Sequence, residues 1–304
     1  MEFPGGAGLV AGPSAWVLID ADPLKSFGPA LVWATRQGAS DVHLLVDGSA
    51  DVLARRASCF SQPPTIWQID ETSLHAAAPA DPAVPAPAPS APALAELLVD
   101  ADLEVVVEDG IVRGEVLGLE VARIVHGTTS TGIPIDDPTL EVGVGHADRE
   151  LTAMLHGKLS PVDQLARVSE IVREHRRPGA ERHPLNQLAP ERWLRVCLQR
   201  TPERLGLADL HSIAPTVARP NLRDTAIAMA RGATSDGDSV VVACSVGVDL
   251  DLVPAAADAR LSAAPDARLV LVVPERDAHP VTRQLAASLV VPAEVVVVDD
   301  DWRC

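Results

Sequence analysis

The chain has 304 residues, of which 47% are hydrophobic and 3% aromatic, and its formal net charge is −17. The length suggests two domains, the composition is that of a globular rather than a disordered protein, and the acidic charge disfavours bulk binding to nucleic acid. No apolar run reaches the roughly 18 residues of a membrane span, and the first thirty residues lack a signal-peptide pattern, so we expect a cytoplasmic protein without a membrane interaction.

Strands and helices alternate through residues 1–75, the first predicted unit. The pattern predicts strands at 15–20, 42–47 and 64–69, and helices at 25–37 and 49–60. This alternation favours parallel β-α-β units. Asp20 and Asp22 lie at the carboxyl edge of the predicted sheet, where open α/β sheets bind ligands, and are candidates for a small-ligand or nucleotide site. No phosphate-binding glycine motif supports a nucleotide, because the glycines at 5, 6 and 8 precede any predicted strand.

A Pro/Ala-rich segment at 76–92 is predicted to be a linker or long loop, and residues 93–185 follow as the middle region. Asp109-Gly110 is a hairpin signal within an antiparallel β-meander. Glu104, Glu115 and Glu120 punctuate the meander, and such alternation predicts that they lie on the solvated face of the sheet. After the meander, Ser160 and Pro161 predict the start of a helix that runs to His175.

Glu141, His146 and Asp148 form the densest polar cluster of the middle region, at a junction between a strand and a helix. One hypothesis makes them a ligand-binding, metal-binding or acid–base set on a flexible loop. The alternative, which the spacing favours, gives Asp148 an N-cap role before a helix at 149–157 and leaves His146 in a solvated loop.

Charge is distributed unevenly along the chain. Residues 96–150 contain 13 acidic and 3 basic residues, whereas residues 151–206 contain 6 acidic and 10 basic residues. We expect these two segments to neutralise each other at an internal interface; a basic patch that contacts nucleic acid is the alternative.

The four cysteines, Cys59, Cys197, Cys244 and Cys304, occur singly, without a C-x-x-C pair. Neither a zinc ribbon nor a thioredoxin-type site is therefore predicted. Cys244 lies within an apolar run and is expected to be a small buried hydrophobe.

Residues 186–304, the last predicted domain, repeat the plan of the first. Strands are expected at 239–246, 267–274 and 293–299, with helices at 252–262 and 280–289. The repeat indicates either an old duplication or two α/β layers that follow the same rules.

The order of features from Ala189 onward, over about 110 residues, resembles the PD-(D/E)XK nuclease superfamily. The helix PERWLRVCLQR carries Glu191 at the acidic position of the family's first helix, and Asp224 lies at the metal-binding Asp position of its β-hairpin. The resemblance implies a restriction-endonuclease-like α/β domain. The E-x-K positions, however, correspond to Ala243, which cannot ligate a metal, and Ser245, which cannot supply a positive charge.

The sequence is compatible with three functions. The favoured one is a non-catalytic binding or assembly protein with a degenerate nuclease fold, without a cofactor, and a homo-oligomer is compatible with it. The second is a divergent nuclease that holds Mg²⁺ with Asp224, Glu191 and a migrated acid, Asp249 or Asp251. The third is a small-ligand or nucleotide sensor built on the first α/β unit.

Overall fold

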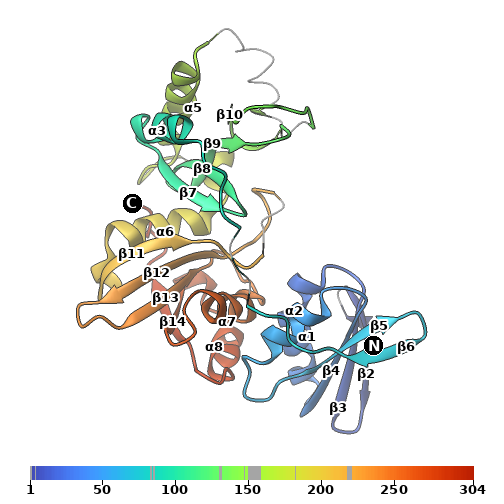
Figure 1. Ribbon diagram of the computed structural model, residues 1–304. Helices are drawn as coiled ribbons and strands as arrows, with labels where there is room; N and C mark the ends of the chain where they lie inside the picture. Colours follow the sequence, from blue (N-terminus) through green and yellow to red (C-terminus); the bar gives the residue numbers. More distant parts are fainter. Residues whose placement is uncertain are drawn as a thin grey trace. The chain divides into compact units, whose positions relative to one another are not determined.

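The computed structural model describes every residue except 1, 4, 83, 85, 130, 131, 147, 150–158, 182 and 218–220. The chain divides into two compact units that are not collinear with the sequence (Figure 1). Unit 1 comprises residues 1–84 and 238–298, and unit 2 comprises residues 85–237 and 299–304. The chain therefore passes from one unit to the other three times.

The first half of unit 1 is a six-stranded sheet with two helices. Its elements are β1 (Glu2–Phe3), β2 (Gly6–Ala11), β3 (Ser14–Ile19), α1 (Pro23–Arg36), β4 (Asp41–Val46), α2 (Ala50–Ala57), β5 (Thr65–Asp70) and β6 (Ser73–Ala76). The strands follow the order β1-β2-β3-β4-β5-β6. Strands β3, β4 and β5 are parallel, which confirms the predicted β-α-β unit, and the remaining pairings of this sheet are antiparallel.

The prediction that no strand contains the early glycines was wrong, because Gly6 and Gly8 lie in β2. A Cβ atom on Gly8 would lie 2.4 Å from the ring of Trp33 in α1. Glycine at this position lets the indole pack directly on the strand, a role that the hydrophobic pattern does not report.

The second half of unit 1 repeats the strand–helix plan. Its elements are β13 (Ser239–Cys244), α7 (Leu252–Ala263), β14 (Arg268–Pro274), a 3-10 turn (Glu275–Asp277), α8 (Pro280–Ala287) and β15 (Glu294–Val298). The three strands are parallel. Cys244 is fully buried, as predicted.

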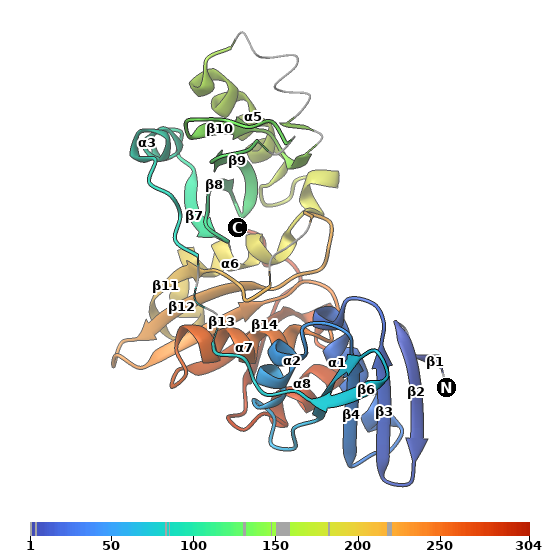
Figure 2. The same ribbon diagram turned by 45° about the vertical axis from the view of Figure 1, so that its right-hand side comes forward.

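The two halves of unit 1 meet through their helices. Helices α1 and α2 pack on β3, β4 and β5, helix α7 packs on β13 and β14, and α7 also packs on α1 and α2 (Figure 2). The turns after α2 and α8 join in an antiparallel bridge, in which the N–H of Ser61 donates to the carbonyl of Ser288 at 2.9 Å and that of Val290 to Cys59 at 2.8 Å. Unit 1 therefore consists of four layers: the six-stranded sheet, the helices of the first half, the helices of the second half, and the parallel strands of the second half.

A buried ion pair fixes the helix layers to each other. Asp258 of α7 is fully buried and accepts hydrogen bonds from Arg55 at 2.6 and 3.2 Å and from Arg56 at 3.4 Å, both in α2. Arg56 also donates to the carbonyl of Leu24 at 2.7 Å. A buried carboxylate requires such partners, so Asp258 ties the two halves together.

Unit 2 contains the predicted antiparallel meander and several helices. Its elements are α3 (Pro92–Asp100), β7 (Glu104–Glu108), β8 (Ile111–Val116), β9 (Leu119–Val125), β10 (Thr139–Val142), α5 (Pro161–His175), 3-10 turns (Pro184–Asn186 and Pro202–Leu205), α6 (Pro190–Arg200), β11 (Leu207–Ile213) and β12 (Ala228–Thr234). The meander has the order β10-β9-β8-β7, and β11 pairs antiparallel with β12. Ser160 caps α5 as predicted, since its hydroxyl accepts the N–H of Asp163.

The two faces of the meander differ in chemistry. One face is apolar, and Leu98 of α3 with Leu165 and Val172 of α5 completes its core. The other face carries glutamate and arginine side chains. Helix α6 lies against this charged face, so closely that a Cβ atom on Gly118 would be 2.5 Å from the backbone of Arg192. No described helix is long and apolar enough to cross a membrane.

Candidate functional site

Unit 1 brings the loop after β13 against the start of α1. Asp251 is 8% exposed, and its carboxylate accepts the N–H of Gly28 at 2.8 Å. A Cβ atom on Gly28 would lie 2.0 Å from the carbonyl oxygen of Leu250, so only glycine permits this approach. Asp251 precedes α7, but its side chain does not cap that helix. From its turn before α7, its carboxylate binds the backbone of the other half of the unit instead.

Burial raises the pKa of Asp251 to about 7, and the N–H of Gly28 opposes this shift. The negative charges of Asp249 and Asp22 raise the pKa of Asp251 further, while Arg56 lowers it. Burial also raises the pKa of Asp249, whose carboxylate accepts the N–H of Asp251 at 2.9 Å. The carboxyl group of Asp251 therefore exchanges its proton near neutral pH.

Asp22 and Asp249 thus both raise the pKa of Asp251, although the sequence assigned these three residues to two different sites. Asp22 came from the ligand hypothesis, and Asp249 and Asp251 came from the nuclease hypothesis. Lys25 forms an ion pair with Asp22 at 3.5 Å and lowers the pKa of Asp249. Asp20 does not join this group by any described contact: it is exposed, and its backbone N–H donates to Gly5 at 3.0 Å.

The other residues of the nuclease hypothesis, Glu191 and Asp224, belong to unit 2. Glu191 is 2% exposed in the first turn of α6. Asp224 precedes β12 in a turn where its N–H donates to the side chain of Asn221 at 3.0 Å. Ala243 and Ser245, at the E-x-K positions, are fully buried. Within the described ranges, no three His, Cys, Asp or Glu side chains are grouped to hold a metal ion.

The cluster at Glu141, His146 and Asp148 lies in unit 2. Glu141 is half-buried in β10, 3.7 Å from the guanidinium of Arg149. Asp148 accepts the N–H of Val144 at 2.7 Å, and His146 is exposed. Asp148 has helical backbone, so it follows the start of the helical turn rather than capping it. Most of the helix predicted at 149–157 lies outside the described residues.

Unit 2 contains a buried network of charged side chains that was not predicted from the sequence. Arg192 and Arg195 of α6 pair with Glu108 and Glu115, the latter at 3.2 Å from Arg195. Arg113 lies 2.9 Å from both Glu108 and Glu120. The pairs that Arg192 and Arg195 form with Glu108 and Glu115 confirm that the acidic and basic segments neutralise each other internally.

The predicted solvated position of Glu115 and Glu120 was wrong, because they are only 1% and 3% exposed. Burial favours the neutral form of Glu115, but Arg192 and Arg195 outweigh it and lower the pKa of Glu115. Each of these carboxylates is occupied by guanidinium groups, so the network is a polar core that joins α6 to the sheet.

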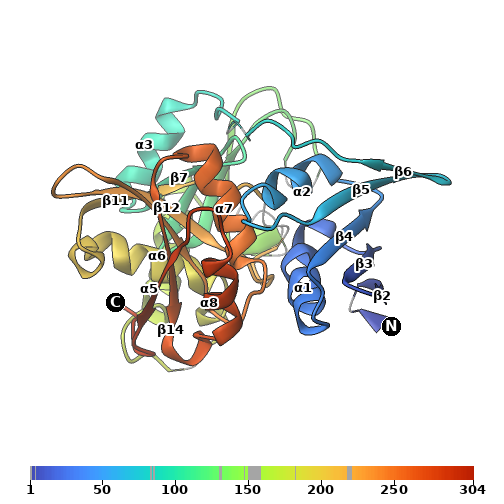
Figure 3. The ribbon, with the colours of Figure 1, turned by 90° about the horizontal axis from the view of Figure 1, so that it is seen from below.

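The six-stranded sheet of unit 1 has an open face, which we define by Leu9, Trp16, Leu18, His43, Leu45, Trp67, Ile69 and Leu74. Strand alternation places these side chains opposite Ala15, Val17 and Ile19, which are buried beneath the helices. Both α1 and α2 lie on the buried side (Figure 3). Among the described elements of unit 1, none packs on the open face.

Aromatic and polar groups are ordered on the open face. Trp16 and His43 stack with ring centroids 3.8 Å apart, and the indole N–H of Trp67 donates to Nδ1 of His43 at 3.2 Å. Nε2 of His43 then donates to Asp41 at 2.9 Å, and Ser14 donates to the same carboxylate at 3.0 Å. Because the hydroxyl bonds the carboxylate and not the imidazole, this set does not have the geometry of an activated nucleophile.

In comparisons with known proteins, no family model, no curated protein and no solved structure matches the chain. The nuclease resemblance therefore stays a prediction from the sequence.

Proposed function

We propose that the chain is a non-catalytic binding and assembly protein, and that two copies associate through the open face of unit 1. The observation that carries this proposal is the uncovered face of the parallel strands β3, β4 and β5. Parallel sheets occur almost only with both faces covered. In unit 1 the helices cover one face, and Leu9, Leu18 and Leu74 on the other are 62%, 39% and 44% exposed.

The chemistry of the open face favours a second copy as its occupant. Its centre holds aliphatic and aromatic side chains, and strand alternation places the charged ones at its ends, at Asp20, Asp41 and Asp47. A face of this kind is self-complementary, since two apolar sheets pack at about 10 Å without burying an unpaired charge. A basic partner protein is the competing occupant, and it would be drawn by the acidic ends.

The size of the face fits a weak dimer. Strand spacings of about 4.8 Å and a rise of about 3.3 Å per residue give roughly 500 Å² for the six strands. Two copies would then bury about 1,000 Å², near the lower limit of a specific interface. We therefore expect a dissociation constant on the order of micromolar.

The edges of the same sheet offer a poorer route to assembly. The edge strands β1 and β6 have 2 and 4 residues, whereas β2 to β5 have 6 each. Short edge strands provide few unpaired backbone groups for strand addition. Association through the open face is therefore favoured over strand addition at an edge.

The absence of catalysis in this proposal is supported by Ala243 and Ser245, whose side chains replace the E-x-K pair of the nuclease resemblance. The proposal keeps that resemblance as a degenerate fold and places the chain in the cytoplasm. Under the nuclease alternative, Mg²⁺ would bind and Asp224→Ala would abolish an activity. Calorimetric titration with Mg²⁺ and Mn²⁺ separates the two functions, because our proposal predicts no binding heat.

The dimer is tested by Leu9→Glu with Leu18→Glu, which place charges in the centre of the open face. Sedimentation velocity from about 1 µM to about 100 µM should show the wild type converting to dimer and the variant remaining monomeric. Val162→Glu, at a site in α5 that is 55% exposed, is the matched control and should associate as the wild type does. A wild type that is monomeric throughout, or a variant that still dimerises, would overturn the proposal.

A further inference from the structure

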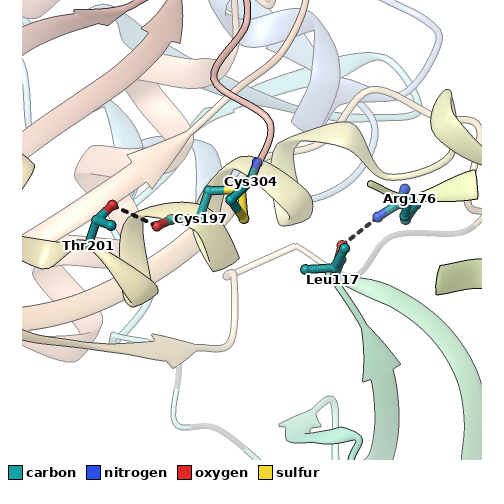
Figure 4. The surroundings of a disulfide bond; sticks show 5 residues. All are labelled: Leu117, Arg176, Cys197, Thr201 and Cys304. Carbon is teal, nitrogen blue, oxygen red and sulfur yellow. Dashed lines mark hydrogen bonds between the residues drawn. A yellow bond between two sulfur atoms is a disulfide. The ribbon is translucent and has the colours of Figure 1, made fainter. Parts of the chain in front are cut away.

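Residues 299–304 are covalently attached to α6 through Cys304. After passing through unit 1 as residues 238–298, the chain returns to unit 2 for residues 299–304. There Cys304 forms a disulfide with Cys197, which lies 107 residues earlier, with the two Cα atoms 5.5 Å apart (Figure 4). The N–H of Cys304 also donates to Sγ of Cys197 at 3.0 Å.

The terminal segment 299–304 covers an aromatic core residue. Trp193 of α6 is fully buried, and Trp302, itself 4% exposed, packs edge-on against it with centroids 5.9 Å apart. The guanidinium of Arg303 lies 5.6 Å from the Trp193 ring and 4.8 Å from the Trp302 ring. These contacts come from a segment that the disulfide holds by its last residue.

Helix α6 contributes the fixed side of this attachment. Arg176 lies over Trp193 at 5.1 Å and donates to the carbonyls of Leu117 and Leu188. Thr201 donates to the carbonyl of Cys197 at 2.9 Å at the end of the helix. Figure 4 shows Cys197 on α6 with Cys304 beside it.

We propose that Cys197–Cys304 is a thiol–disulfide exchange site that takes a dithiol reductant and controls whether the segment 299–304 stays on α6. Cys197 is 2% exposed, whereas Cys304 is half-buried, so an incoming thiolate reaches Sγ of Cys304. That attack forms a mixed disulfide at Cys304 and expels Cys197 as a thiolate, which takes up a proton. The second thiol of the reductant then breaks the mixed disulfide, which leaves two protein thiols and an oxidised reductant.

The other two cysteines do not compete for this chemistry. Cys59 and Cys244 carry buried thiols, and burial raises the pKa of Cys59, which keeps it protonated and unreactive. Opening the disulfide releases Trp302 and Arg303 and uncovers Trp193. The inference does not depend on the proposed dimer, which is tested at Leu9 in unit 1.

The first experiment counts thiols in denaturant with a chromogenic disulfide reagent. After incubation with oxidised glutathione, the inference predicts that two of the four cysteines react before reduction and all four react after it. Peptide mass spectrometry should identify the pair as Cys197 and Cys304. Four reactive thiols in the oxidised sample would overturn the inference.

The second experiment measures hydrogen exchange of the segment 299–304 and of α6, with and without a dithiol. The N–H groups of Trp302 and Cys304 are bonded in the oxidised form, so reduction should speed exchange in this segment about tenfold or more. Cys304→Ser should match the reduced wild type whether or not the dithiol is present. Cys59→Ser, the matched control, should behave as the wild type. Unchanged exchange after complete reduction would show a disulfide that controls nothing.

Discussion

Replacing Asp251 with asparagine tests whether the buried carboxyl group that joins the two halves of unit 1 is protonated in the folded chain. Asparagine keeps the size of the side chain and the oxygen that accepts the Gly28 N–H, but it removes the charge. The pKa of Asp251 is about 7 in the folded chain, about three units above that of an ordinary aspartate. Between about pH 4 and pH 7 the folded chain therefore holds a proton that the unfolded chain has released.

The sign of the effect follows from this difference. The free energy of unfolding of the wild type should fall by about 1.4 kcal/mol per pH unit through this range, or about 4 kcal/mol in all, because only the unfolded chain gains the stable ionised carboxylate as the pH rises. Asp251→Asn cannot ionise and should lack this slope. The variant should match the wild type near pH 4 and exceed its stability by up to about 4 kcal/mol at pH 8.

Urea unfolding across this pH range measures the difference in stability. Unfolding is monitored by hydrogen exchange of α1, so that the signal reports unit 1. Asp266→Asn is the matched control, because Asp266 is exposed, and it should keep the wild-type slope. Parallel pH profiles for the wild type and Asp251→Asn, or a variant less stable at pH 8, would refute the assignment of a protonated buried carboxyl to Asp251.

Three further substitutions test the packing of the two units. Gly28→Ala should destabilise unit 1 by about 1–3 kcal/mol in urea unfolding, because its Cβ would meet a backbone carbonyl, whereas Gly48→Ala has open space and should be tolerated. Glu115→Gln should lower the free energy of unfolding of unit 2 by about 3–5 kcal/mol at pH 7. The penalty should be smaller below about pH 4, because the glutamate of the unfolded wild-type chain is protonated there. An equal penalty at both pH values would contradict the ion pairing of Glu115. Asp258→Asn should cost unit 1 a similar amount by leaving buried guanidinium groups without a counter-charge, while Glu294→Gln, at an exposed pair, should change stability by less than about 1 kcal/mol.

The parallel strands could be predicted because their core residues are local and regular. AWVLID, VHLLVD and PTIWQI each precede or follow a predicted helix, and the structure confirms all three strands, although α2 is shorter than expected. The short strands at the edges of the sheet were missed. Strand β2 was missed as well, because its glycines and alanines give no hydrophobic alternation, although Trp33 of α1 packs closely against Gly8.

The buried charges of unit 2 show the limit of a local pattern. Glu115 and Glu120 alternate as solvated residues do, and only the excess of arginine further along the chain indicated an internal partner. The pairing of Glu115 with Arg192 joins residues 77 positions apart. Sequence spacing carries no information about such a contact, whereas the balance of charge between the two segments does.

The joint at Asp251 and the disulfide were outside the reach of the sequence for a related reason. Unit 1 is discontinuous, so Gly28 and Asp251 meet across 223 positions. Cys197 and Cys304 are likewise single cysteines with no paired motif near either one. What the sequence did provide was the set of candidate acids, of which Asp22, Asp249 and Asp251 act on each other in the structure.

Sedimentation velocity of the wild type at low and high salt tests the central claim most directly. Two copies that each carry a net charge of −17 repel one another, and salt screens this repulsion while the apolar contact remains. The account predicts a dimer whose dissociation constant decreases as salt rises from about 0.05 M to about 0.5 M, and its loss in the Leu9→Glu, Leu18→Glu variant. A chain that stays monomeric at every salt concentration, or a dimer that the substitutions leave intact, would contradict it.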